Sequence, residues 1–195
     1  MTASPRPVLP RAFYDRPTLE VAPDLLGKYL VRELDGHRRI GRIVEVEAYI
    51  GAEDLACHAR FGKTARTWPM FGPPGHAYVY LIYGTAHMLN IVTEPEGCPA
   101  AVLVRALEPI DQIDRPVNGP GKLCAALAID RRFSGHDLLL PPLTIEDWGD
   151  HPRRIVTTPR INIDYAGPWR EKPWRFVDGD SRFLSVRLPR RYRER

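Results

Sequence analysis

Hydrophobic and polar residues alternate with a period of two along much of the chain, which is typical of half-buried β-strands. The segments 28–34 and 38–49 flank an Asp-Gly dipeptide, which favours a two-residue hairpin turn. The segments 77–83 and 87–93 flank a glycine and predict a second hairpin. Residues 100–109 form a further apolar strand that ends at a proline.

Helical patterns are short and few. The stretch 18–26 predicts a helix with Thr18 as its N-cap and Gly27 as its stop. The stretch 118–129 predicts a second helix that begins among glycine and proline residues. Many strands joined by hairpins, with few helices, predict one domain of mixed α and β structure with mainly antiparallel pairing.

Other segments carry weaker patterns. Glycine and proline are frequent in 50–76 and 137–160, so irregular structure is expected there. Short closing strands are expected at 160–165 and 182–186. Residues 1–11 are rich in proline and arginine and are expected to form a flexible arm.

The composition is that of a folded chain with a local excess of positive charge. Its 195 residues are 44% hydrophobic, which suffices for a core. The net charge is +4, and the last nine residues, RLPRRYRER, alone sum to +4, so the remainder is neutral on balance. A nucleic-acid partner would therefore need a local basic stripe. Only four of the 28 basic residues are lysines, which suits phosphate contacts by arginine and equally fits GC-biased coding.

No cofactor, metal or disulfide is indicated. The chain has three cysteines, Cys57, Cys98 and Cys124, without a CxxC pair. Its histidines and cysteines match no zinc-ligand spacing, and no glycine-rich nucleotide-binding motif is present. No apolar signal core or membrane-length run occurs, so a cytoplasmic, reduced location is expected.

The strand RIVEVEAY places two carboxylates and a phenol on one face. A period of two separates Val44, Val46 and Ala48 from Glu45, Glu47 and Tyr49. One interpretation is a solvated strand face. The other is a general base, because a glutamate beside an aromatic wall can hold and activate a water molecule.

Three tyrosines in AYVYLIYG raise a similar choice. Tyr78 and Tyr80 share a face with Ile82, whereas Tyr83 lies on the opposite face at the hairpin tip. A tyrosine-rich edge strand and a pocket wall with an exposed tip aromatic both fit this pattern. In NGPGK, the free backbone N–H groups near Gly121 and Lys122 could bind a phosphate. The alternative interpretation is an ordinary helix start.

Together these stretches resemble the alkyladenine (3-methyladenine) DNA glycosylase family, in the expected order over residues 18–187. The matching stretches are RIVEVEAY, DLACHAR, MFGPPGHAYVYLIYG, LN at 89–90, VLVRALEP, GPGKLCAALAID and DYAGPWREKPWRF. The resemblance implies an α+β domain over 12–187 with a curved, open-barrel-like antiparallel sheet, a protruding hairpin and flanking helices. An Arg-rich tail, 188–195, would follow as a phosphate-binding arm or a solvated extension.

The resemblance also implies an activity: a monofunctional enzyme that acts as a monomer, without a cofactor, removes damaged purines from double-stranded DNA. It implies that Glu47 is the base that activates water and that Arg105 orients the Glu47 carboxylate. Tyr49, His58, Tyr80 and Asn90 would form the base pocket, with Asn90 at its floor, and Tyr83 would wedge into the duplex. Gly121 and Lys122 would contact the DNA backbone. The short connection between Pro109 and Gly119 departs from the family pattern and affects affinity more than chemistry.

Two other functions remain open at this point. A related N-glycosidase could act on free nucleosides or RNA, and would then retain nucleoside hydrolysis without activity on duplex DNA. A nucleic-acid-binding module with a dead site is the other alternative. The joint presence of Glu47 and Arg105 argues against it, because binding to a polyanion needs no carboxylate facing it.

Overall fold

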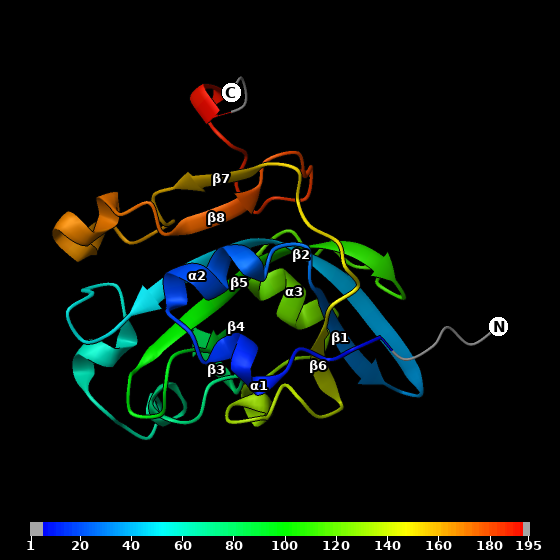
Figure 1. Cartoon of the computed structure of the whole chain (residues 1–195), viewed down its shortest axis with the longest axis horizontal. Coiled ribbons are helices and arrows are strands. Elements are labelled where there is room, and N and C mark those ends of the chain that lie inside the picture. Colours follow the sequence, from blue (N-terminus) through cyan, green and yellow to red (C-terminus); the bar gives the residue numbers. More distant parts are fainter. Residues whose placement is uncertain (1–5, 193–195) are drawn as a thin grey trace.

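The computed structural model describes residues 6–192 of the chain, and eight strands form one curled antiparallel sheet (Figure 1). Six strands follow the order β3-β4-β5-β2-β1-β6, and β8 pairs with both β2 and β7. The sheet forms a half-barrel, which confirms the predicted α+β fold with a curved antiparallel sheet. The strands are β1 (Tyr29–Leu34), β2 (His37–Ile50), β3 (Ala77–Ile82), β4 (Ala86–Val92), β5 (Ala100–Asp111), β6 (Leu143–Glu146), β7 (Ile155–Thr158) and β8 (Arg175–Asp178).

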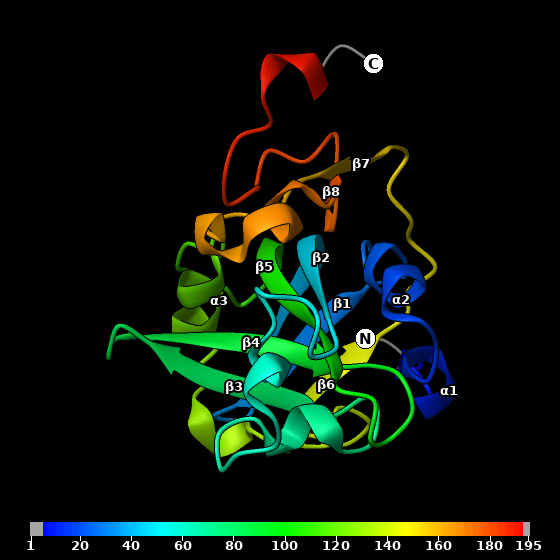
Figure 2. The ribbon, with the colours of Figure 1, turned by 90° about the vertical axis from the view of Figure 1, so that its left-hand side faces the viewer.

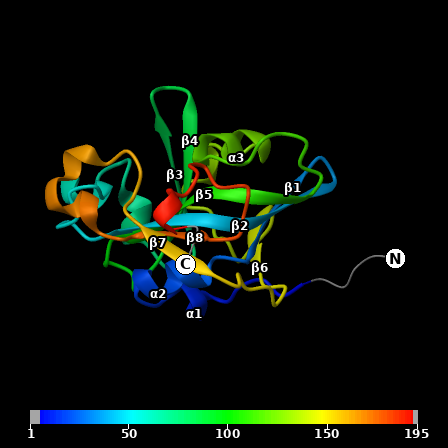
Figure 3. The same ribbon diagram turned by 90° about the horizontal axis from the view of Figure 1, so that it is seen from above.

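Both predicted hairpins are present. Asp35 and Gly36 connect β1 to β2 with φ of 53° and 77°, the positive values that a tight two-residue turn requires. β3 and β4 pair up to Ile82 and Ala86, which leaves a three-residue tip that contains Tyr83. This hairpin protrudes from the body of the molecule (Figures 2 and 3).

Strand β2 organises the sheet because it pairs with three other strands. One edge pairs with β5 along almost its whole length, while the other edge pairs first with β1 and then with β8. The register with β5 shifts between Ile43 and Val46, where the partner on the other edge changes. An irregularity of this kind bends a strand and increases its twist. The bend lies next to Glu45 and Glu47.

Within residues 6–192 there are three short α-helices: α1 (Arg11–Tyr14), α2 (Thr18–Asp24) and α3 (Pro120–Ala126). The main core joins α2 and α3 to the apolar faces of β2, β4 and β5, through residues such as Val21, Leu123, Leu89 and Val104. A second, smaller cluster of buried residues packs against β3 and includes Tyr78 and Met70. No helix within residues 6–192 has the length and apolar character needed to cross a membrane.

Some expected elements differ from the structure. Residues 160–165 and 182–186 form no strands, and the closing strands are instead β7 and β8, with β6 on the far edge. The predicted cap of α2 is also wrong. Pro17 precedes the helix, and the Thr18 hydroxyl instead contacts Thr93 and Glu94.

The described residues near the two termini are more closely packed than the sequence pattern indicated. Leu9 is buried, its N–H donates to Ile145 O, and Val8 forms a bridge with Glu146. The described part of the expected flexible arm is therefore attached to β6. Leu188, in the expected tail, packs in a small core with Val156. Residues 1–5 and 193–195 lie outside the described residues.

Candidate active site

A cavity of about 360 Å³ opens between the β3–β4 hairpin, the end of β2, the start of α3 and the segment that follows Arg160. Six of the nine predicted site residues line it: Tyr49, His58, Tyr80, Tyr83, Asn90 and Arg105. Further lining residues include Arg66, Met88, Pro120, Ile161 and Tyr165. The volume lies near the lower end of the range typical of small-molecule sites.

Two carboxylates on β2 lie behind this cavity. Glu45 and Glu47 both have 0% exposure, so the solvated strand face is excluded. Arg105 on β5 reaches both: Nε donates to Glu45 Oε1 at 3.0 Å and Nη1 donates to Glu47 Oε2 at 3.2 Å. Burial would lower the pKa of Arg105, but Glu47 and Glu45 raise it above its ordinary value. The guanidinium therefore stays charged between them.

Glu45 is fully occupied by structural partners. Besides Arg105, it accepts hydrogen bonds from Arg175 Nε at 2.8 Å, Ser185 N at 2.6 Å and Ser185 Oγ at 2.7 Å. Burial would raise the pKa of Glu45, but Arg175, Ser185 and Arg105 hold it below its ordinary value. Glu45 is therefore held by three neighbouring residues, of which only Arg105 lines the cavity.

Glu47 lies directly behind the cavity wall. Its Oε2 accepts from Tyr49 Oη at 2.8 Å and from Arg105, and its Oε1 accepts from Ile161 N at 2.7 Å. Tyr49, Arg105 and Ile161 line the cavity, although Glu47 itself is not part of the lining. A carboxylate offers about four acceptor positions. The hydrogen bonds from Tyr49, Arg105 and Ile161 occupy three of them.

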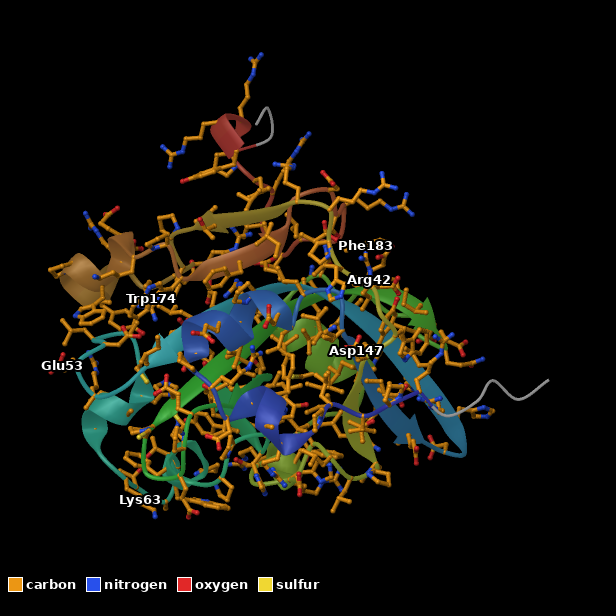
Figure 4. The ribbon with its side chains drawn as sticks, in the orientation of Figure 1. Arg42, Glu53, Lys63, Asp147, Trp174 and Phe183 are labelled. Atoms are coloured by element: carbon orange, nitrogen blue, oxygen red, sulfur yellow. The ribbon has the colours of Figure 1, made fainter. Side chains whose placement is uncertain are left out.

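Tyr49 is supported from behind by a buried ion pair. Arg160 lies over its ring, with 4.7 Å from the guanidinium carbon to the ring centre, and donates to Asp54 at 2.6 and 2.8 Å. Burial and then Glu47 raise the pKa of Tyr49, so its hydroxyl remains a donor. Arg160 also lies 5.1 Å from the ring centre of Trp174, which sits at the same end of the molecule as Glu53 and Lys63 (Figure 4).

The opposite wall combines β3 with the irregular segment before it. Tyr78, Tyr80 and Ile82 all line the cavity, as their shared strand face predicts, while Val79 points into the main core. His58 packs edge-on against Tyr80 at 4.6 Å between ring centres, and its Nδ1 lies 3.0 Å from Tyr78 Oη. Burial, then Arg66 and Arg60, lower the pKa of His58 to about 4. The imidazole is therefore neutral at physiological pH.

Asn90 lies opposite Tyr78 in the hairpin and lines the cavity. Its Nδ2 donates to Tyr78 O at 3.1 Å and to Met88 O at 3.3 Å. These bonds explain how an amide is accommodated in an apolar strand. They also occupy the donor group, so the amide affects the cavity chiefly through its shape and its oxygen.

The remaining predicted residues lie around the cavity mouth. Tyr83 is 92% exposed at the hairpin tip, with φ of 51°. Gly121 lies close to this hairpin, because a Cβ there would come within 3.0 Å of the Ala86 Cβ. Lys122 is exposed, and its Nζ lies 3.4 Å from Asn118 Oδ1.

Several residues that shape this site were not singled out from the sequence. They are Asp54, Arg66, Arg160, Arg175 and Ser185. The sequence could have indicated Arg175, because this arginine lies in the aromatic stretch WRFV and a buried charge requires a partner. Ser185 has none, because its role depends on a loop that returns to β2 from 140 residues away.

The comparisons with known proteins point in one direction. Residues 12–182 match the family model described as methylpurine-DNA glycosylase. A protein of Methanocella arvoryzae is 55% identical over 94% of this chain and 98% of its own length. A protein of Anaeromyxobacter sp. (strain Fw109-5) is 55% identical over 95% of this chain and 95% of its own length. A protein of Legionella pneumophila (strain Lens) is 50% identical over 91% of this chain and 97% of its own length. All three are named "Putative 3-methyladenine DNA glycosylase".

The buried ion pair behind Tyr49 yields a stability prediction. Asp54→Asn removes the charge that compensates Arg160, whose side chain is fully buried. Breaking a buried pair in this way costs about 3–5 kcal/mol of unfolding free energy. Urea unfolding measures it. The control is Glu171→Gln, which breaks the exposed pair with Arg170 and is expected to cost less than about 1 kcal/mol. Equal effects of the two substitutions would contradict the structural role of Asp54.

Proposed function

Because the chain belongs to the methylpurine-DNA glycosylase family, we propose that it removes alkylated or deaminated purines from duplex DNA with a water molecule activated by Glu47. The family assignment makes it a DNA N-glycosylase, a hydrolase whose substrate is DNA. The observation that supports the finer proposal is the position of Glu47. This buried carboxylate is held by Arg105 and the Ile161 N–H immediately behind an aromatic cavity.

The proposed reaction begins with extrusion of the damaged nucleotide from the helix, because the target bond is inaccessible within stacked DNA. The base enters the cavity between Tyr49 and the Tyr80–His58 wall, where stacking contributes about 1–3 kcal/mol per aromatic contact. Water then attacks the sugar carbon C1′ and gives its proton to Glu47. The electrons of the C1′–N bond pass to the departing base, and an abasic site remains.

Arg105 would hold the Glu47 carboxylate in place during this step. Its own charge is secured by the two carboxylates, so its orientation does not depend on the substrate. Tyr49 contributes a wall and, through its hydroxyl, fixes the carboxylate rotamer. This arrangement uses only side chains of the protein and a water molecule.

We propose that the enzyme is monofunctional. A lyase reaction needs an amine nucleophile that forms a Schiff base. Within the described residues no lysine lines the cavity, and Lys28 is buried in an ion pair with Asp147. The chemistry therefore ends at the abasic site.

Duplex DNA would be engaged by the cavity rim. The exposed ring of Tyr83 projects from the hairpin and would fill the gap left by the extruded nucleotide, as inserted side chains do at kinked base steps. Gly121 and Lys122 lie beside the same hairpin and would contact the phosphate backbone. We propose that a monomer suffices, since all of these elements come from one chain, and that it acts on DNA in the cytoplasm.

The direct test is incubation with duplex oligonucleotides that carry hypoxanthine or ethenoadenine, followed by detection of abasic sites. Abasic sites at the lesion support the proposal. Their absence, combined with hydrolysis of free nucleosides or of RNA, would instead favour an N-glycosidase with another substrate.

Glu47→Gln tests the general base. The variant keeps the shape of the side chain and an oxygen acceptor, so DNA binding should persist. Base release should fall by about 10²–10⁴-fold, the contribution of a positioned base. Single-turnover release and lesion-DNA binding are measured in parallel. Near-normal turnover in a folded Glu47→Gln protein would remove Glu47 from this role.

Substitutions of Tyr83 and Tyr80 should affect activity on duplex and single-stranded DNA differently. Tyr83→Ser should weaken activity on duplex DNA more than on single strands, where no gap has to be filled. Tyr80 lines the cavity, so Tyr80→Ser should reduce release from both substrates alike. Equal losses on the two substrates for Tyr83→Ser would rule out the wedge.

Asn90 should exclude undamaged guanine. Stacking walls do not discriminate among purines, whereas guanine carries an extra amino group at C2 on its minor-groove edge. Because the Asn90 donor is bound to Tyr78 O and Met88 O, exclusion must come from steric conflict, not from a mismatched donor. Asn90→Ala should raise guanine release relative to hypoxanthine release. An unchanged ratio in a folded, active variant would assign discrimination to another residue.

A further inference from the structure

The loop that follows β8 reaches the buried carboxylates behind the cavity at Ser185. Two groups of this residue contact Glu45: the backbone N–H donates to Oε2 at 2.6 Å, and the hydroxyl donates to Oε1 at 2.7 Å. The same hydroxyl oxygen accepts from Arg105, at 3.3 Å from both Nε and Nη2. Ser185 itself does not line the cavity.

The Ser185 hydroxyl is fully used by these contacts. A hydroxyl offers one donor and two acceptor positions. The donor goes to Glu45, and both acceptor positions go to the guanidinium of Arg105. A single oxygen atom therefore joins the Glu45 carboxylate to two nitrogens of the planar guanidinium, and its orientation is fixed.

The guanidinium of Arg105 is held by three residues. Nε donates to Glu45 at 3.0 Å, and Nη1 donates to Glu47 at 3.2 Å. Hydrogen bonds between a charged donor and a carboxylate are commonly about 2.7–2.9 Å long, so the contact with Glu47 is a long one. It depends on how the other contacts orient the planar group. Among residues 6–192, Ser185 is the only hydrogen-bond partner of Nη2.

Removal of this hydroxyl alone would leave the loop attached to the sheet. The Ser185 N–H still donates to Glu45, and the Val186 carbonyl still accepts from Arg175 Nη2 at 3.0 Å. The change would instead fall on Arg105, because Nη2 would lose its partner. The guanidinium would then lack one of the contacts that fix its plane.

We propose that Ser185 is a positioning residue for base release. Its hydroxyl fixes the plane of the Arg105 guanidinium, and thereby the Nη1 group that holds the Glu47 carboxylate. The inference rests on the proposed function, because it assumes that Glu47 activates the attacking water. It adds a residue from a loop outside the cavity, which acts on the rate of the chemical step and not on the binding of the base.

The experiment measures single-turnover base release at saturating enzyme, with binding of the same lesion DNA in parallel. The duplex carries hypoxanthine or 7-methylguanine, whichever the wild-type protein releases faster. Ser185→Ala should lower the release rate by about tenfold, less than the roughly 10²-fold that a misplacement of about 1 Å can cost. DNA binding should stay the same, because Ser185 does not line the cavity. Ser185→Thr, which keeps a hydroxyl, should restore most of the rate.

The matched control is Ser181→Ala. Ser181 lies near the start of the same loop, and its hydroxyl oxygen accepts from Phe183 N at 3.1 Å. Both substitutions remove one hydroxyl from the loop, but only Ser185→Ala should slow release. Unchanged release in Ser185→Ala would overturn the inference. Equal losses for the two variants, or thermal unfolding of Ser185→Ala at the assay temperature, would assign the hydroxyl to loop stability and overturn it as well.

A second arm combines Ser185→Ala with Glu47→Gln. Residues that act as a unit have strongly non-additive effects on catalysis. Because the hydroxyl acts through the Glu47 carboxylate, Ser185→Ala should lower release little further in the Glu47→Gln protein, whereas losses from instability would multiply. Multiplied losses would overturn the inference and leave the proposed function intact. Release of neither lesion by the wild-type protein would overturn both.

Discussion

The salt-bridge cluster around Arg105 is the constraint on which the rest of the site depends. Two carboxylates, Glu45 and Glu47, are completely shielded from solvent on one strand. Uncompensated, such charges would be very costly, and each would neutralise instead. Arg105 binds both and Arg175 binds the first, so two negative and two positive charges are held together. Arg105 is the residue that links Glu47 to this cluster.

The fold brings these groups together from distant parts of the chain. Arg105 comes from β5 and Arg175 from β8, the partners on opposite edges of β2. The bend in β2 lies at the point where β8 replaces β1, so the irregular register serves the pairing that delivers Arg175. Two loops add backbone donors, Ile161 N to Glu47 and Ser185 N to Glu45. Each of the two carboxylates is thus held both by Arg105 of β5 and by a backbone donor from a loop.

The sequence predicted the features that depend on neighbouring residues. It did not predict the features that depend on charge compensation by residues far away in the chain. The Asp35-Gly36 turn and the alternation along β3 are local, and both match the structure. Glu45 and Glu47 left two interpretations open, because the arginines that permit their burial lie on other strands. Strands β6 to β8 were missed since each has four residues, too few for a clear period. The family resemblance, not periodicity, assigned individual roles to the pocket residues.

The balance of charge also explains how a protein for a polyanionic substrate can contain a buried anion. The cluster of Glu45, Glu47, Arg105 and Arg175 is neutral as a whole, and so is the pair formed by Asp54 and Arg160. Neither group presents net negative charge to approaching phosphates. Arg66 lines the cavity, is exposed and has no ion-pair partner among the described residues. A site built in this way can bury carboxylates without repelling a polyanion.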